Sequence, residues 1–319
     1  MATFSRRDLL WAASAAAAVR PAASATADGR PTICAFSKHF QWTDVPGAAE
    51  TVRDIGYEAL DLTVRRAGHV LPERVADDLP KAAEAIKNAG VKLAMITTDI
   101  VDPKTPHAEA VLKTTASLGL KHYRWGGFRY DLKRSLPDQI AEFKPRVKDL
   151  AAMNKQYGLT AMYHTHSGVT QVGASMWDLY LLLKDFDTES VSANYDVAHA
   201  TVEGGFGGWI HSSHLLLPYT RGIAVKDFKW IRNEKGAWIP GWCALGDGMV
   251  DFKKFFAMLR STGFAGPLQL HMEYPEVGSA ATGKFESSIP KDRLMTILRR
   301  DLTRLKDMLR EASIPVVAG

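Results

Sequence analysis

The chain has 319 residues, of which 46% are hydrophobic and 24% are charged, and its formal net charge is +5. This length suffices for one large domain with a sizeable core, and so small an excess of positive charge gives no indication of a nucleic-acid or membrane-surface partner. Two cysteines are too few for a disulfide framework, and we expect both to be ordinary small buried residues.

The first 25 residues have the features of an export signal. Arg6 and Arg7 precede a weakly apolar, alanine-rich run over residues 9–19, and small side chains suited to cleavage end at Ala25. The run is too short to span a membrane. The segment looks like a twin-arginine signal, which predicts a periplasmic or otherwise exported protein with residues 26–319 as its mature domain. Because that route exports proteins that have already folded, a metal acquired in the cytoplasm is expected.

The mature chain repeats one unit, in which a helical pattern closes on glycine and a short apolar run follows. Glycine suits the position after a helix because that position commonly needs positive φ. Eight runs are predicted strands, at residues 33–36, 59–63, 93–97, 122–125, 161–164, 191–195, 223–226 and 268–272. Apolar periodicity predicts helices that include residues 75–88, 140–157, 177–186, 252–261 and 294–312. Eight alternations predict a single-domain (β/α)8 TIM barrel, with a doubly wound open sheet as the weaker alternative.

Polar side chains gather at the ends of the predicted strands, where a barrel of this kind carries its chemistry. His164 and His166 are two residues apart on a strand, so both point to one face. Asp196 is followed within one turn by His199, and Glu273 ends the last strand. Carboxylate and imidazole together suit Mn²⁺, Zn²⁺, Co²⁺ or Fe²⁺, and no cysteine cluster indicates a structural zinc. We therefore expect one divalent metal ion at this end of the barrel.

Five short motifs follow one another along the chain: YHTHSG at 163–168, YDVAH at 195–199, VKDF at 225–228, LGDGMVDF at 245–252, and GFAGP at 263–267 leading to Glu273. In their order and spacing they resemble the xylose isomerase-like TIM barrel superfamily of sugar phosphate isomerases and epimerases. Epimerases of that kind bind one divalent ion through Glu, Asp, His and Glu from strands five to eight. The resemblance implies that Asp196 and Glu273 are ligands and that His199 is the histidine that accompanies the aspartate.

The chain departs from that ligand pattern at two positions. His164 stands where the epimerases carry the strand-five glutamate, and Ala224 stands where they carry the strand-seven histidine. A retained metal site would need His164 as a substitute and a further donor from His166, His199 or His271. The first change also removes one of the two carboxylates used in two-base epimerisation. One-base chemistry, such as isomerisation or β-elimination, therefore gains support.

The chemistry shared by such enzymes is abstraction of a proton from the carbon next to a carbonyl group. A cation assists this step by stabilising the negative oxygen that develops. Glu273, or the imidazole of His164 or His166, is the candidate base. Lys226 is the candidate for neutralising the enediolate, and a salt bridge from Lys226 to Asp227 is the equally weighted structural alternative.

Side chains near the strand ends are candidates for binding a sugar. Trp125 and Trp230 are the preferred aromatic platforms, because a flat apolar face can stack on the C–H face of a sugar ring. The segment 228–248 is the expected substrate-covering loop. The remaining candidate substrate-binding residues are Lys38, Arg124, Asp227 and His271.

Taken together, these observations predict a metal-dependent sugar or keto-sugar isomerase or epimerase. The alternatives are a lyase or hydratase that eliminates from keto-sugars or 3-keto-glycosides, and a non-catalytic sugar-binding barrel. The expected partner is a small carbohydrate, with neither nucleic acid nor a membrane span, and the sequence is compatible with a homo-oligomer. An endonuclease of the same superfamily is disfavoured by the export signal and the mild charge.

Overall fold

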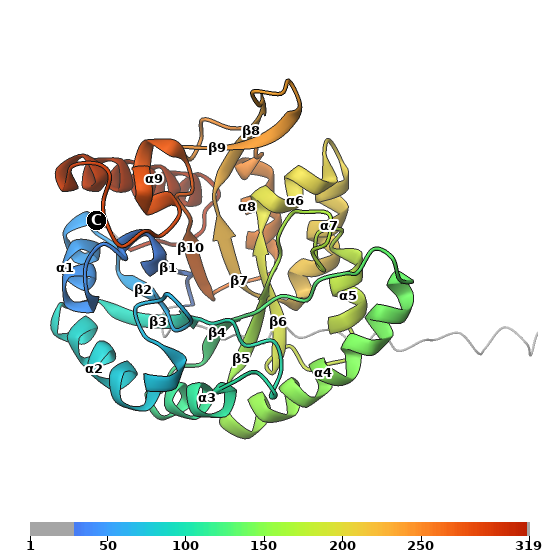
Figure 1. Ribbon diagram of the computed structural model, residues 1–319. Coiled ribbons are helices and arrows are strands. Elements are labelled where there is room, and N and C mark those ends of the chain that lie inside the picture. The colour runs from blue at the N-terminus through green and yellow to red at the C-terminus, as the bar shows by residue number, and fades with distance from the viewer. Residues whose placement is uncertain (1–28, 318–319) are drawn as a thin grey trace, which may run out of the picture.

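The computed structural model describes residues 29–317, in which eight parallel strands close into a barrel (Figure 1). Each strand pairs with the next along the sequence, and the last pairs with the first. This closure confirms the predicted (β/α)8 barrel and excludes the open sheet, whereas the signal expected over residues 1–25 lies outside the described residues. The barrel strands are β1 (Thr32–Phe36), β2 (Ala59–Thr63), β3 (Lys92–Thr97), β4 (His122–Trp125), β5 (Thr160–His164), β6 (Val191–Asp196), β7 (Thr220–Val225) and β10 (Pro267–Leu270).

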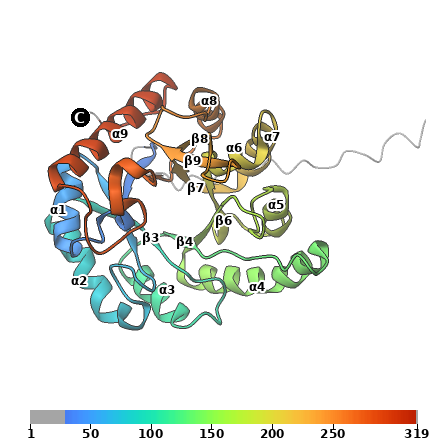
Figure 2. The same cartoon turned by 45° about the horizontal axis from the view of Figure 1, so that its top comes forward.

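Helices surround the barrel in chain order, as Figures 1 and 2 show from two directions. Among residues 29–317, no helix combines the length and the hydropathy that crossing a bilayer requires. The α-helices are α1 (Val45–Ile55), α2 (Val75–Asn88), α3 (Ala108–Ser117), α4 (Leu136–Tyr157), α5 (Trp177–Leu183), α6 (Val197–Gly204), α7 (Gly208–Leu216), α8 (Phe252–Ser261) and α9 (Lys291–Glu311). Short 3₁₀ segments span Ser37–Phe40, Pro72–Arg74, Leu217–Tyr219 and Pro275–Ala281.

Local sequence signals explain where the helices begin and end. Asp44 accepts a hydrogen bond from the Gly47 amide at 3.0 Å and caps the first turn of α1. Gly56 ends the same helix with a φ of 102°, and Gly158 ends α4 with a φ of 67°, a region that side chains with a Cβ disfavour. The glycine at position 222, expected at a helix-to-strand junction, instead lies inside β7.

The segment expected to be a covering loop is a two-stranded antiparallel hairpin. Its strands are β8 (Asp227–Arg232) and β9 (Trp238–Cys243), and they follow β7 directly. The turn is held by Asn233, whose side-chain oxygen accepts hydrogen bonds from the amides of Lys235 and Ala237. The hairpin projects beyond the strand ends in the upper part of Figure 1, so it is placed to cover one side of the barrel mouth.

Both cysteines are free thiols in the described structure. Cys34 is fully buried in β1, as expected for a small core residue, and Cys243 is half-buried at the end of β9. Neither of them lies within the group of side chains that gathers at the barrel mouth.

Polar groups enter the barrel interior toward the mouth. Asn194 of β6 donates a hydrogen bond to the Gln269 side chain of β10 across the interior, at 2.8 Å. Asp61 of β2 is fully buried, and the Thr97 hydroxyl lies 2.9 Å from both of its carboxylate oxygens. Burial raises the pKa of Asp61 to about 7, although the Thr97 hydrogen bond opposes the shift. The carboxyl group therefore carries a stability cost once it ionises.

Replacing Asp61 with Asn should change the pH dependence of stability. The pKa of Asp61 is about 7 in the folded state and about 3.9 in an unfolded chain. Because the carboxyl group of Asp61 keeps its proton to a higher pH in the folded state than in the unfolded state, the wild-type protein loses stability as the pH rises from about 4 to about 7. Denaturant unfolding at pH 5 and pH 8 should show that the stability of Asp61→Asn relative to wild type is greater at pH 8 than at pH 5 by roughly 3 kcal/mol. A pH-independent difference between the two proteins would contradict the raised pKa.

Candidate active site

Side chains from five strand ends meet at the barrel mouth. Lys38 follows β1, His164 ends β5, Asp196 ends β6, Lys226 lies one residue beyond β7, and Glu273 follows β10. Lys38 and Glu273 retain 18% and 20% of their side-chain exposure, whereas Lys226 retains 3% and Asp196 none. The outer pair therefore faces solvent, and the inner pair lies beneath it.

The ammonium group of Lys226 lies at the centre of this group. Its Nζ is 2.7 Å from Nε2 of His199, 2.8 Å from Oε2 of Glu273 and 3.5 Å from Oδ2 of Asp196. It also lies 4.3 Å from the centroid of the Trp242 ring, which is a cation–π distance. The expected alternative of a salt bridge to Asp227 is wrong, because that carboxylate accepts hydrogen bonds from the backbone amides of Phe228, Gly246 and Gly248 instead.

Glu273 is held between two lysines. Oε1 lies 2.6 Å from Nζ of Lys38, and Oε2 lies 2.8 Å from Nζ of Lys226. Burial favours the protonated acid, but the two ammonium charges outweigh burial and hold the pKa of Glu273 well below its usual range. The carboxylate is therefore ionised and is a weak base in this arrangement.

The contacts of His199 fix its tautomer. Lys226 has only protons to offer, so Nε2 of His199 accepts a hydrogen bond from the ammonium group. Nδ1 then carries the ring proton and donates to Oγ of Ser167 at 2.7 Å. Burial, followed by the charge of Lys226, lowers the pKa of His199 well below the usual histidine value, so the ring is neutral.

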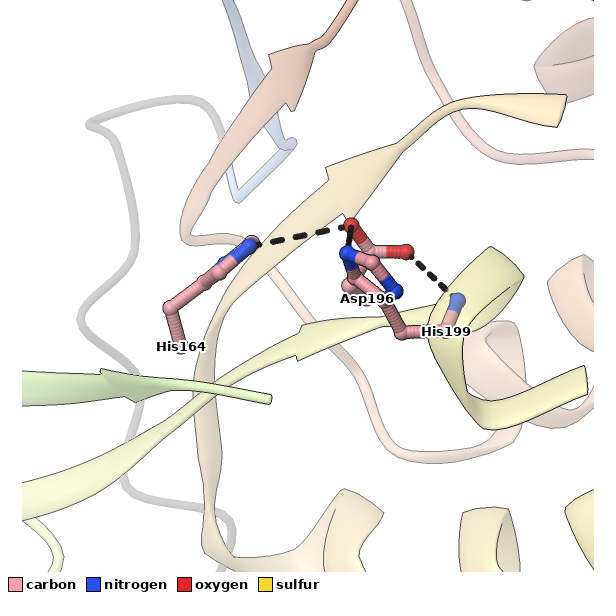
Figure 3. Close-up of side chains that lie close together, drawn as sticks. All are labelled: His164, Asp196 and His199. Atoms are coloured by element: carbon pink, nitrogen blue, oxygen red, sulfur yellow. Dashed lines mark hydrogen bonds and ion pairs between the residues drawn. The ribbon is translucent and has the colours of Figure 1, made fainter. Parts of the chain in front are cut away.

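Asp196 connects this histidine to a second one (Figure 3). Its Oδ1 caps α6 by accepting hydrogen bonds from the amides of Ala198 and His199, both at 3.0 Å. Its Oδ2 is buried, has no hydrogen-bond partner among the described residues, and lies 3.8 Å from Nε2 of His164 and 3.9 Å from Nε2 of His199. Donor atoms of His164, Asp196 and His199 all lie within 4.8 Å of one another, which makes this cluster a possible metal site.

Imidazole and carboxylate donors suit a divalent ion. The position of Lys226, however, is unfavourable for an ion bound to them. An imidazole nitrogen has one lone pair, and that of His199 Nε2 already accepts a proton from Lys226. An ion bound to Asp196 Oδ2 would also face the ammonium charge 3.5 Å from that oxygen. The structure does not group Glu273, the fourth expected ligand, with the cluster. As arranged here, these residues do not fit a resident metal ion.

His166 is less buried than His164, His199 and His271 and has one ring nitrogen without a hydrogen-bond partner among the described residues. Its Nδ1 lies 2.8 Å from the carbonyl oxygen of Ser167 and therefore carries the ring proton, which leaves the Nε2 lone pair free. Its ring lies 4.0 Å from that of His199, and the residue is half-buried. Burial lowers the pKa of His166, so the ring is neutral at neutral pH. Its Nε2 can therefore accept a proton.

His164 and His271 form a deeper, neutral layer. Their rings lie 5.5 Å apart, and His271 stacks on Phe36 at 4.7 Å. Burial is the main cause that lowers the pKa of both imidazoles well below the usual value. Nδ1 of His164 and Nε2 of His271 are buried without a hydrogen-bond partner among the described residues, so each can still accept or donate one bond.

The tryptophans are arranged differently from expectation. Trp125 is 1% exposed, its Nε1 donates to the Val101 carbonyl, and its ring packs edge-on against Tyr163. Trp230 is 41% exposed on β8, with its ring edge-on to Phe228. The ring that reaches the centre is that of Trp242, which contacts His199 edge-on at 5.0 Å. The sequence offers Trp242 as one of several candidate sugar platforms, but Trp125 and Trp230 are the preferred ones.

Two other expected substrate contacts have different surroundings. Asp227 accepts hydrogen bonds from the amides of Phe228, Gly246, Gly248 and Val250, so it organises the segment after β9. Arg124 is half-buried in β4, and its guanidinium lies 5.9 Å from the centroid of the Phe36 ring. Ser167, which orients His199, was overlooked because a single serine in a loop gives no sequence signal of its own.

Known proteins with similar sequences and folds include sugar-modifying enzymes. An inosose dehydratase from Geobacillus thermodenitrificans (strain NG80-2) is 27% identical over 139 residues, which are 40% of this chain and 44% of that protein. The chain thus aligns with less than half of that relative's length.

Solved structures that share the fold include the following two. Because their sequence identity to this chain is low, the similarity establishes the fold and nothing about the reaction. A 3-keto-D-glucoside 4-epimerase from E. coli is 14% identical with a TM-score of 0.61, covering 86% of this chain and 100% of that chain. A xylose isomerase-like TIM barrel protein from Mycobacterium smegmatis, in complex with magnesium, is 15% identical with a TM-score of 0.60, covering 87% and 99%.

The family assignment rests on a match over most of the chain. The sequence profile of the xylose isomerase-like TIM barrel family matches residues 49–311, which include every barrel strand except β1. Together with the closed eight-stranded barrel, this match shows that the chain belongs to the xylose isomerase-like TIM barrel family.

Proposed function

We propose that the protein is an enzyme that acts on a sugar or keto-sugar by removing a proton from the carbon next to a carbonyl group. Isomerisation or epimerisation is the outcome that the family and its epimerase structures support. The observation that carries the proposal is that one ammonium group, of Lys226, and one imidazole with an unpartnered nitrogen, of His166, both contact His199. An acid and a base held on one short path are what enolate formation requires.

In this proposal Lys226 stabilises the negative oxygen. Two of its three N–H groups contact His199 and Glu273, and the contact to Asp196 is long at 3.5 Å. The third N–H can therefore turn to a substrate oxygen. Because the ammonium is buried and held by its partners, it needs little rearrangement as charge develops on that oxygen.

His166 acts as the base, and Glu273 holds the lysines. The Nε2 lone pair of His166 is free, whereas both oxygens of Glu273 contact ammonium groups. A carboxylate with a strongly lowered pKa accepts a proton poorly. A single base can remove and return a proton on only one face of the substrate. This favours isomerisation over epimerisation that uses two bases on opposite faces.

Elimination of water is the second candidate reaction. It begins with the same proton abstraction from a keto-sugar, and the sequence similarity to an inosose dehydratase supports it. A non-catalytic sugar-binding barrel is the remaining alternative. A divalent ion (Mn²⁺, Zn²⁺, Co²⁺ or Fe²⁺) held by His164, Asp196 and His199 would require Lys226 to leave its present position.

The first test follows solvent deuterium. Purified protein is incubated in deuterated water with a panel of keto-sugars and 3-keto-glycosides, and NMR records deuterium on the carbon next to each carbonyl. His166→Asn should lower the exchange rate by at least about 100-fold, because removing a general base costs that much. Glu273→Gln should cost less, since Lys226 retains His199 as a partner.

Matched controls are available on the surface. His211→Asn and Glu286→Gln make the same chemical changes at exposed positions and should leave the rate unchanged. A larger loss in Glu273→Gln than in His166→Asn would reassign the base to the carboxylate. Sugar binding without any exchange would favour the binding barrel.

The second test asks which cation the site takes. Lys226→Met frees Nε2 of His199 and removes the charge next to Asp196, so calorimetry with Mn²⁺ and Zn²⁺ should show binding at least about tenfold tighter than in wild type. Adding Asp196→Asn should abolish the gain. Lys38→Met, which touches Glu273 but none of the three donors, is the control. Equal affinity in wild type and Lys226→Met would show that Lys226 does not block a metal.

A further inference from the structure

Two arginines share one aromatic ring beside the site. Arg65 follows β2 and Arg124 lies in β4, and each guanidinium carbon is 5.9 Å from the centroid of the Phe36 ring. The same ring stacks on His271 at 4.7 Å. The pair therefore lies next to the histidine layer beneath the proposed reaction centre.

Apart from the Phe36 ring, neither guanidinium has a hydrogen-bond or ion-pair partner among the described residues. Across residues 29–317, no side-chain hydrogen bond and no carboxylate within ion-pair distance is found for Arg65 or Arg124, although both residues are half-buried. Burial, and next the charge of Arg65, lowers the pKa of Arg124. Each group offers up to five N–H donors, so this arrangement is costly unless an anion completes it.

The nearby carboxylates do not supply that anion. Glu273 contacts Lys38 and Lys226, and the free oxygen of Asp196 is nearest to Lys226. Asp61 hydrogen-bonds to Thr97, and burial raises its pKa to about 7, so it is only partly ionised at neutral pH. The mouth thus holds two lysines and two arginines against Glu273, whose pKa is lowered, and against Asp196 and Asp61, whose pKa values burial raises.

We propose that Arg65 and Arg124 bind an anionic group of the substrate, a carboxylate or a phosphate, through the forked donors of both guanidinium groups. This inference rests on the proposed function, because it places the anion at one end of a sugar whose carbonyl reaches Lys226. Arg124 is near that centre, since its charge adds to burial in lowering the pKa of His164 and of His166. The substrate class is therefore a sugar acid or a sugar phosphate rather than a neutral sugar.

The test compares three ketoses that differ at one carbon. D-Fructose, D-fructuronate and D-fructose 6-phosphate carry a hydroxyl, a carboxylate and a phosphate at that carbon, and calorimetry measures their binding to the full chain. At least one anionic sugar should bind about tenfold or more tightly than D-fructose, because hydrogen bonds between ionised groups are roughly twice as strong as neutral ones. Which of the two binds more tightly identifies the anion.

The variants assign the preference to the arginines. Arg65→Gln and Arg124→Gln should each reduce the preference for the anionic sugar over D-fructose to less than about threefold. Arg66→Gln, at the neighbouring exposed position, should leave that preference unchanged. Melting curves check that each variant is folded. Equal binding of the three sugars, no binding of either anionic sugar, or an unchanged preference in both variants would overturn the inference.

Deuterium exchange separates this inference from the proposed function. Exchange into D-fructose alone would support proton abstraction and overturn the anion site. Tight binding of an anionic sugar that depends on Arg65 and Arg124, without exchange into any sugar, would support the anion site and remove the proposed reaction.

Discussion

The buried ammonium group of Lys226 is the constraint on which the rest of the mouth depends. A buried charge is costly unless it is paired and hydrogen-bonded, and this one is surrounded by His199, Glu273 and the face of Trp242. Each partner is fixed in turn: His199 has one tautomer, Glu273 stays ionised, and β9 of the hairpin is held against the barrel. The charge thus joins the ends of β6, β7 and β10 to the hairpin.

The position of this charge follows from the register of the strands. Ala224 of β7 lies opposite Asp196 of β6 and carries no donor, although the family resemblance places a histidine there. Lys226 comes two residues later, on the same face of the strand, and its long side chain reaches back to the aspartate and the histidine of α6. The neighbouring carboxylates of Asp196 and Glu273 thereby have a positive partner in Lys226.

The sequence predicted the barrel because strand and helix periods alternate eight times, and six of its eight strands begin and end within one residue of expectation. β7 was misplaced because its first residues, Thr220 and Arg221, are polar but buried. The hairpin was missed because a short antiparallel pair has the composition of an aromatic-rich loop. Within the site, the sequence named Lys226, Glu273 and the histidines. It could not show that both oxygens of Glu273 contact lysines, since such pairing depends on side chains far apart in the chain.

The central claim is that an ammonium group assists proton transfer in this barrel. Its most direct test is the rate of deuterium exchange into a responsive sugar before and after exhaustive treatment of the protein with a chelator. The account predicts an unchanged rate after chelation and no increase when Mn²⁺ or Zn²⁺ is added. Loss of exchange on chelation, with recovery at one equivalent of a divalent ion, would contradict it.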